Sequence, residues 1–262
     1  MSEPLDHSKE ITQVNPGPKP LWNAGIREFF MLFLAVFCGF LAENYREKLA
    51  DNEAEKQSME LLAKSLKSDT LELSKTIRMY NERGLFVDSF IHLKDSDFSL
   101  SENRRLFFKY TIMGMLNSRF FNINQSGFEQ LKYSGTIRQV SNQEILQRLG
   151  VYYNAYQTEI LAEENDYKIW YQHTIPRLME VTDYSIFGGG KPGFIFVLFP
   201  QMNISNQPIP AIKMNADQKQ SLFGFAANLQ IADEAYAMLL EEQKKRADTL
   251  ITMLNSEYSI NR

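Results

Sequence analysis

An apolar run near the start of the chain limits its possible folds more than any other feature. From Phe29 to Ala42, fourteen successive residues include no charged side chain, and Arg27, Glu28 and Glu43 flank the run. As a helix it would span about 21 Å, whereas the hydrocarbon core of a bilayer is about 30 Å thick. A helix that begins at Leu21 instead would measure about 33 Å, which is long enough to cross a bilayer.

Three interpretations of this run are possible: a membrane-spanning helix, the core helix of a soluble scaffold, and a cleaved signal peptide. Trp22 and Tyr45 would lie at opposite interfaces of a bilayer, where aromatic residues are enriched. A signal peptide is disfavoured because no small-x-small cleavage site precedes the charged residues that begin at Glu43. The sequence therefore predicts a transmembrane anchor over residues 21–43, with Trp22 and Tyr45 as its interface anchors.

Small residues form a stripe along this predicted anchor. Ala35, Gly39 and Ala42 follow steps of four and three, so they share one face of a helix. Stripes of this kind let two membrane helices approach closely, which makes these three residues a candidate membrane-helix contact face. The alternative is that small residues occur in the span without any role in association.

The rest of the chain predicts a mainly α fold. Beyond the anchor, apolar residues recur at alternating steps of three and four, and no strong helix breaker occurs before the turn at Asp95-Ser96-Asp97. We therefore expect the anchor to continue into a long-helix antiparallel bundle, in which the first helix, a helix from Ser141 and the last helix pack together. The predicted seam of the first helix comprises Met59, Leu62, Leu66, Thr70, Leu73, Ile77, Tyr80, Gly84, Val87 and Ile91.

Local signals predict where the helices begin and end. Capping boxes are expected at Ser99-x-x-Glu102, at Ser141-Asn142-Gln143-Glu144 and at Asn215 with Gln218, and Gly135 is placed to end a short helix. Pro176 should interrupt or end the helix that precedes it. An irregular segment follows at about 184–214, in which only Phe194–Phe199 could form a strand. These signals divide the chain into a flexible tail (1–20), the anchor (21–43) and a helical domain (44–262).

The composition excludes several classes of function. With 28 Lys and Arg against 32 Asp and Glu, the net charge is −4, so the chain has no basic excess for nucleic acid. The one cysteine, Cys38, lies within the apolar run, and the three histidines are too scattered to ligate zinc together. The triple glycine before Lys191 is followed by Pro192, which rules out a phosphate-binding loop.

The sequence therefore predicts no catalytic residues, no metal site and no cofactor. The acidic residues around Glu163 fit a solvated helix face better than a metal site, because Lys168 lies beside them and no partner cluster matches them. An enzyme whose site is dispersed along the chain remains an alternative. Its distinguishing mark would be one tight polar cluster in a loss-of-function scan.

One group of aromatic residues is a candidate binding surface. Tyr152, Tyr156, Tyr167 and Trp170 recur at helical spacing and could form an aromatic wall for a sugar or a lipid. At the same spacing such residues more often form the core and its rim. Both interpretations are kept here.

The order of these features resembles a family of uncharacterised bacterial single-pass membrane proteins, known as a domain of unknown function. Members carry a glutamate before the anchor, about fifteen mostly apolar residues and then Asn-Trp-x-Glu, where this chain has Glu28, the run from Phe29 and Asn44-Tyr45-Arg46-Glu47. The resemblance covers roughly residues 25–160. Its later part comprises Phe128-Glu129-Gln130-Leu131-Lys132-Tyr133-Ser134-Gly135, Ser141-Asn142-Gln143-Glu144 and Tyr152-Tyr153. Tyr45 departs from the family's tryptophan, and residues 184–214 match nothing in it.

The resemblance implies a protein of the bacterial inner membrane, with a cytoplasmic N-terminus and a helical periplasmic domain. Charge alone does not decide this orientation, because three basic residues flank each side of the anchor. A tail of about twenty residues is too short for a cytoplasmic output domain. We therefore expect a membrane-anchored interaction or ligand-binding module, with the lipid bilayer and a protein partner or a homo-oligomer as its contacts.

Overall fold

The computed structural model describes residues 21–183 and 209–260, with side chains from residue 25 onward. Neither stretch contains a strand, so the mainly α fold predicted from the sequence is confirmed. Residues 184–208, which include the Phe194–Phe199 run, lie outside the described stretches. The helices are α1 (Leu21–His92), α2 (Ser101–Tyr110), α3 (Ser126–Tyr133), α4 (Gln143–Ala155), α5 (Leu161–Val181) and α7 (Ala216–Tyr258).

Short helical turns connect or extend these helices. Two are 3-10 turns, η1 (Leu93–Asp95) and η3 (Thr136–Arg138). The other two are π-helical: η2 (Thr111–Met115) extends α2, and η4 (Tyr156–Ile160) joins α4 to α5. Because a π turn inserts one extra residue, η4 shifts the helical face of α5 relative to that of α4.

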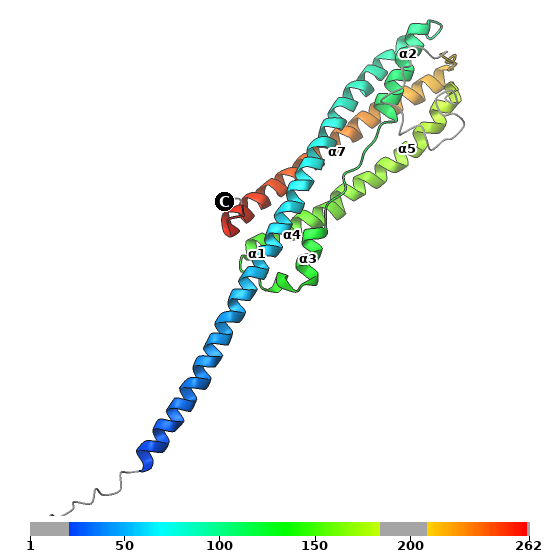
Figure 1. Cartoon of the computed structure of the whole chain (residues 1–262). Coiled ribbons are helices and arrows are strands. Elements are labelled where there is room, and N and C mark those ends of the chain that lie inside the picture. The colour runs from blue at the N-terminus through cyan, green and yellow to red at the C-terminus, as the bar shows by residue number, and fades with distance from the viewer. Residues whose placement is uncertain (1–20, 184–208, 261–262) are drawn as a thin grey trace, which may run out of the picture. The chain divides into compact units, whose positions relative to one another are not determined.

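The chain forms two compact units, one that ends at Glu53 and one that begins at Ala54. In the first unit, every described side chain from Gly25 to Ala50 is exposed. The second unit is a helical bundle, in which α5 and α7 lie along the Ala54–His92 part of α1 (Figure 1). This bundle agrees with the predicted packing of long helices.

Side-chain pairs show that α1 and α7 run antiparallel. Tyr80 packs against Tyr236 with ring centroids 4.9 Å apart, and the Arg83 guanidinium lies 3.2 Å from the Asp233 carboxylate. Further along α1, Phe90 stacks on Phe223. Residue numbers therefore rise along α1 while they fall along α7, as the sequence predicted for the first and last helices.

Two hydrophobic clusters make up the core of the bundle. One combines residues of α1 from Met59 to Leu66 with α4 and the end of α7, and the other combines α1 from Leu73 to Phe90 with α5 and the start of α7. The predicted seam of α1 is mostly buried, but Thr70, Ile77, Gly84 and Ile91 are only partly so. Their places are taken by Asp69, Thr76, Arg83 and Phe90, which are buried and lie one residue earlier.

The predicted helix caps have mixed outcomes. Asn215 and Gln218 form the expected capping box at the start of α7. The predicted box at Ser99 is wrong, because α2 begins at Ser101 and the Asp97 carboxylate accepts hydrogen bonds from the Ser99 N–H and hydroxyl instead. At α4 the cap is Asn142, whose side chain accepts from the N–H groups of Glu144 and Ile145.

Two predicted helix breakers also have different outcomes. Gly135 adopts a left-handed conformation with φ = 76°, which ends the α3 region as expected. Pro176 does not end its helix, because α5 continues through it to Val181.

Candidate functional site

The apolar part of α1 is the first candidate site. It is long and apolar enough to cross a membrane, and none of its apolar window is buried. The predicted contact face of Ala35, Gly39 and Ala42 lies on this exposed helix, and a Cβ added at Gly39 would meet no atom within 4 Å. Phe29, Phe33 and Phe37 stack on the opposite face, as their four-residue spacing requires.

The two predicted interface anchors, Trp22 and Tyr45, both lie on α1. Tyr45 lies on α1 and is 67% exposed. Trp22 lies in the first turn of α1, but its side chain is outside the described part of the chain. Cys38 is exposed on the same helix.

The predicted aromatic surface does not exist as a surface. Tyr152, Tyr156 and Tyr167 are all buried, and Trp170 is partly buried against Phe225. These aromatic rings pack against other side chains inside the bundle. A sugar or a lipid therefore could not stack on them. The core interpretation of these residues applies instead.

A buried ion pair occupies the centre of the bundle. Arg83 of α1 is 0% exposed, and Asp233 of α7 is 2% exposed. The Arg83 Nη1 atom lies 3.2 Å from Asp233 Oδ1, and the Nε–H group donates to the Gly114 carbonyl of η2 at 2.5 Å. The guanidinium also lies over the rings of Tyr80 and Tyr167, at 5.5 and 5.0 Å from their centroids.

The Gly114 contact depends on the absence of a side chain. A Cβ at this position would lie 2.9 Å from the Val87 nitrogen and 3.0 Å from the Phe86 carbonyl carbon, both backbone atoms of α1. The η2 backbone therefore lies directly against α1. Because η2 is a π turn, its carbonyls are displaced from a regular α-helical ladder, and Arg83 reaches one of them.

Burial dominates the electrostatics of this ion pair. It raises the pKa of the Asp233 carboxyl to about 6, although the positive charge of Arg83 and the nearby Tyr167 hydroxyl lower it. Burial likewise raises the pKa of Glu164, which accepts a 2.7 Å hydrogen bond from the Tyr236 hydroxyl. A charge removed from water is costly unless it is paired, so each carboxylate depends on its partners.

A second buried carboxylate joins α1, α4 and the loop before α3. The Tyr152 hydroxyl donates to Asp69 Oδ2 at 2.8 Å, and the Asn124 N–H donates to Asp69 Oδ1 at 2.8 Å. Burial raises the pKa of the Asp69 carboxyl to about 6, while both hydrogen bonds lower it. The Gln243 amide of α7 donates to the Tyr152 carbonyl, which extends this network to a fourth element.

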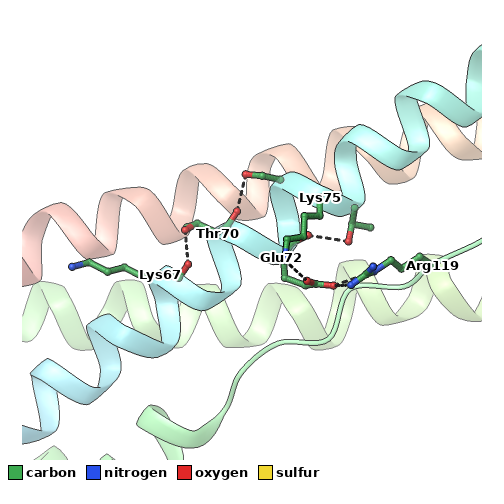
Figure 2. Close-up of polar contacts among 7 residues, drawn as sticks. Lys67, Thr70, Glu72, Lys75 and Arg119 are labelled. Carbon is green, nitrogen blue, oxygen red and sulfur yellow. Dashed lines mark hydrogen bonds and ion pairs between the residues drawn. The ribbon is translucent and has the colours of Figure 1, made fainter.

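Further contacts hold the remaining segments to α1. Figure 2 shows Arg119, from the loop after η2, paired with Glu72, whose other carboxylate oxygen lies 4.0 Å from Lys75. Near the start of the bundle, Glu55 accepts a 2.6 Å hydrogen bond from Tyr258 and one from the Ser141 N–H. The Arg119–Glu72 pair is partly exposed and contributes little stability. Glu55 is only 5% exposed, and its two hydrogen bonds hold Tyr258 and Ser141 to α1.

These arrangements can fix the register of the helices, but they offer no exposed reacting group. Within the described residues, no group of three or more His, Cys, Asp or Glu side chains converges to hold a metal ion. Sequence reasoning missed Asp69, Arg83 and Asp233. The available signal was their position, because a polar residue on the buried side of an amphipathic helix requires a buried partner.

Comparison of the chain with protein-family models, with curated proteins and with solved structures found no match.

Proposed function

We propose that this chain is a membrane-anchored helical module that acts through contacts with other molecules and not through catalysis. In this proposal, the apolar part of α1 crosses the bacterial inner membrane, the N-terminus is cytoplasmic and the bundle from Ala54 onward is periplasmic. The family resemblance of residues 25–160 supports the bacterial origin and the orientation.

The exposure of the apolar helix carries the proposal. Every side chain from Phe29 to Ala42 is exposed in the described structure, and ten of these fourteen are Phe, Leu, Met or Val. Each such side chain gains about 1.5–3 kcal/mol on transfer out of water. A core helix would recover this free energy inside the protein, whereas α1 buries none of its apolar window there. A bilayer is the environment that would recover it.

The buried polar groups support a role through contacts. Asp69 and Glu164 accept hydrogen bonds from tyrosines of other helices, and Asp233 forms an ion pair with Arg83. These contacts suit a structural role for the three carboxylates. Catalysis instead requires groups that a substrate can reach. The surfaces that remain for function are therefore the exposed helix faces.

Membrane fractionation of cells that express the full chain tests the anchor. We expect the protein to sediment with membranes, to resist extraction with salt and alkaline carbonate, and to be released by detergent. Full-length protein in the soluble fraction would show that the apolar run is not an anchor.

Reporter fusions test the orientation separately. A reporter that is active only in the periplasm, fused after about residue 100, should be active, because that position follows the anchor. The matched fusion at about residue 18, before the anchor, should be inactive. Activity in the reverse pattern would place the bundle in the cytoplasm.

A further inference from the structure

The outward side of α1 and α7 carries apolar residues that the bundle leaves uncovered. On α1 these are Leu71 and Leu85, 65% and 70% exposed, with Arg78 between them at steps of seven residues. On α7 they are Ile231 and Met238, 66% and 65% exposed and also seven residues apart. A seven-residue step keeps side chains on one side of a helix, as in helices that pack on a partner. We call this surface, with Glu241, the α1–α7 face.

The α1–α7 face also carries charged side chains beside a groove. A groove between the helices is lined by Arg78 and Leu85 of α1 and by Glu241 of α7, among others. The structure gives neither Arg78 nor Glu241 an ion-pair partner among the described residues. Lys75 and Lys245, in contrast, pair with Glu72 and Glu242 on their own helices.

The register of the bundle fixes which residues of the face lie level with each other. Arg83 is paired with Asp233 and Tyr80 with Tyr236. Leu85 lies two residues after Arg83 on α1, and Ile231 lies two residues before Asp233 on α7. Because the two helices are antiparallel, Leu85 and Ile231 are level with each other. By the same step from Tyr80, Arg78 is level with Met238, and Glu241 lies one helical turn beyond it.

We propose that the α1–α7 face binds a second copy of this chain, through a twofold axis parallel to the helices. Such an axis places α1 of one copy against α7 of the other at the same level. Leu85 then packs on Ile231 of the second copy, and Arg78 reaches Glu241 of the second copy, each contact occurring twice. The face is thus complementary to itself in its apolar residues and in the Arg78–Glu241 pair.

This arrangement rests on the proposed function in one respect. Two copies anchored in the same bilayer share one orientation, so the proposal requires the two bundles to pack in parallel. An antiparallel pair of copies would place Leu85 far from Ile231. A contact between Leu85 of one copy and Ile231 of the other therefore distinguishes the proposed parallel dimer from an antiparallel one.

Cysteine cross-linking between two differently tagged full-length chains tests that contact. Both chains carry Cys38→Ser; one carries Leu85→Cys and the other Ile231→Cys. A disulfide forms only when the Cβ atoms come within about 4.5 Å, so oxidation of membranes should give a mixed dimer. The matched control pairs Ile231→Cys with Met179→Cys, on α5 and similarly exposed, and should give none. No mixed dimer from Leu85 and Ile231, or dimers from Leu85→Cys alone, would overturn the proposal.

Charge exchange provides a second test that does not depend on cysteine chemistry. Arg78→Glu or Glu241→Arg alone should lower the cross-linked fraction by about fivefold, because each places like charges across the axis. The double variant should restore it, since the pair is then reversed but complementary. Failure of the double variant to restore association would refute the Arg78–Glu241 contact.

The same samples separate this proposal from the proposed anchor. Carbonate extraction reports whether the chain is in the membrane, whether or not it cross-links. A soluble chain that still gives the Leu85–Ile231 cross-link would refute the anchor and support the dimer, whereas an anchored chain without the cross-link would do the reverse.

Discussion

At the scale of single residues, the burial of Arg83 carries an electrostatic cost. A fully buried guanidinium loses its hydration, and Asp233, the Gly114 carbonyl and two tyrosine rings offset part of this loss. Buried ion pairs often add little net stability, yet breaking one leaves an uncompensated charge. Any other alignment of α1 and α7 would separate Arg83 from Asp233 and leave buried charges unpaired. This ion pair therefore favours the observed register of the two helices.

Substitution at this ion pair should show that asymmetry. Arg83→Met leaves the Asp233 carboxylate buried without its cation, and we expect the free energy of unfolding to fall by about 3–5 kcal/mol. Combining it with Asp233→Leu should recover most of that loss, because both charges are then gone. Denaturant unfolding of the purified protein measures each value. The control Arg148→Met breaks an exposed pair with Glu144 and should cost less than about 1 kcal/mol; an equal loss there would contradict the argument.

The raised pKa of Asp69 predicts a pH dependence of stability. The folded-state pKa is about 6 and the unfolded value is near 3.8, so the native state binds more protons between these values. Stability contributed by the protonated carboxyl is complete below about pH 4 and is lost as pH rises through 6. For the Asp69 contribution, unfolding should therefore require less denaturant at pH 7 than at pH 5.

Asp69→Asn is the matched variant for this effect. The amide can still accept from the Asn124 N–H and bond to the Tyr152 hydroxyl, but it does not titrate. The difference in stability between pH 5 and pH 7 should shrink, with the remainder coming from groups such as Asp233, whose pKa is also raised to about 6. An unchanged difference would mean that Asp69 is ionised in the folded protein throughout this range.

Only part of this residue-scale detail could be predicted from the sequence. The helical period offered Tyr80 and Tyr152 as core residues, and both are buried. Their polar partners could not be found that way, because Asp69 and Tyr152 are 83 residues apart and their pairing depends on the fold. The predicted seam, which followed steps of three and four, included Thr70 and Gly84. Each lies one residue after a buried charged residue, Asp69 or Arg83.

At the scale of helices, close backbone contact decides where α3 can pack. A Cβ on Gly127 would lie 2.7 Å from the Leu62 Cα and 3.0 Å from the Leu62 nitrogen. Those atoms belong to the α1 backbone and cannot rotate away, so α3 itself would have to shift. The sequence shows a glycine here, but only the packing shows why it is required.

Two glycine substitutions should therefore have opposite effects. Gly127→Ala should lower the free energy of unfolding by about 1–3 kcal/mol, because it overpacks the α1–α3 contact. Gly150→Ala, on the exposed side of α4, meets nothing within 4 Å and should raise it by up to about 1 kcal/mol through helix propensity. Thermal unfolding of the two variants beside the parent measures both. Stabilisation by Gly127→Ala would contradict the close approach of α3 and α1.

The start of α4 gives a second test at this scale. Asn142 caps two backbone N–H groups, whereas the Ser141 hydroxyl, which the sequence favoured, does not cap the helix. Asn142→Ala should cost about 1 kcal/mol of stability, and Ser141→Ala close to none. Equal costs would contradict the assignment of the helix cap to Asn142. Sequence patterns predicted the helix but placed its cap one residue too early, because Ser141 with Glu144 matches the capping-box spacing and Asn142 with Ile145 does not.

At the scale of the whole molecule, the helical period of the sequence was sufficient to predict the fold class. Long helices with one apolar side must bury that side, and antiparallel packing is the simplest way to do so. The π turns at η2 and η4 were not predictable, because each inserts a residue without changing composition. η4 shifts the buried face of α5 relative to that of α4. The one-residue difference in the seam of α1 has another cause, because α1 is a continuous α-helix from Leu21 to His92.

The division of the chain into two units predicts that the bundle folds without the proposed anchor. Both hydrophobic clusters lie between Met59 and Leu254, wholly within the unit that begins at Ala54. A shortened chain that begins at Ala54 should therefore remain in the soluble fraction, show a helix-dominated circular dichroism spectrum and unfold in one cooperative transition. Gly39→Ile in the full chain is the matched control, because it alters only an exposed position of the apolar helix and should leave that transition unchanged. A shortened chain that is soluble but lacks cooperative unfolding would show that residues before Ala54 are needed for the bundle to fold.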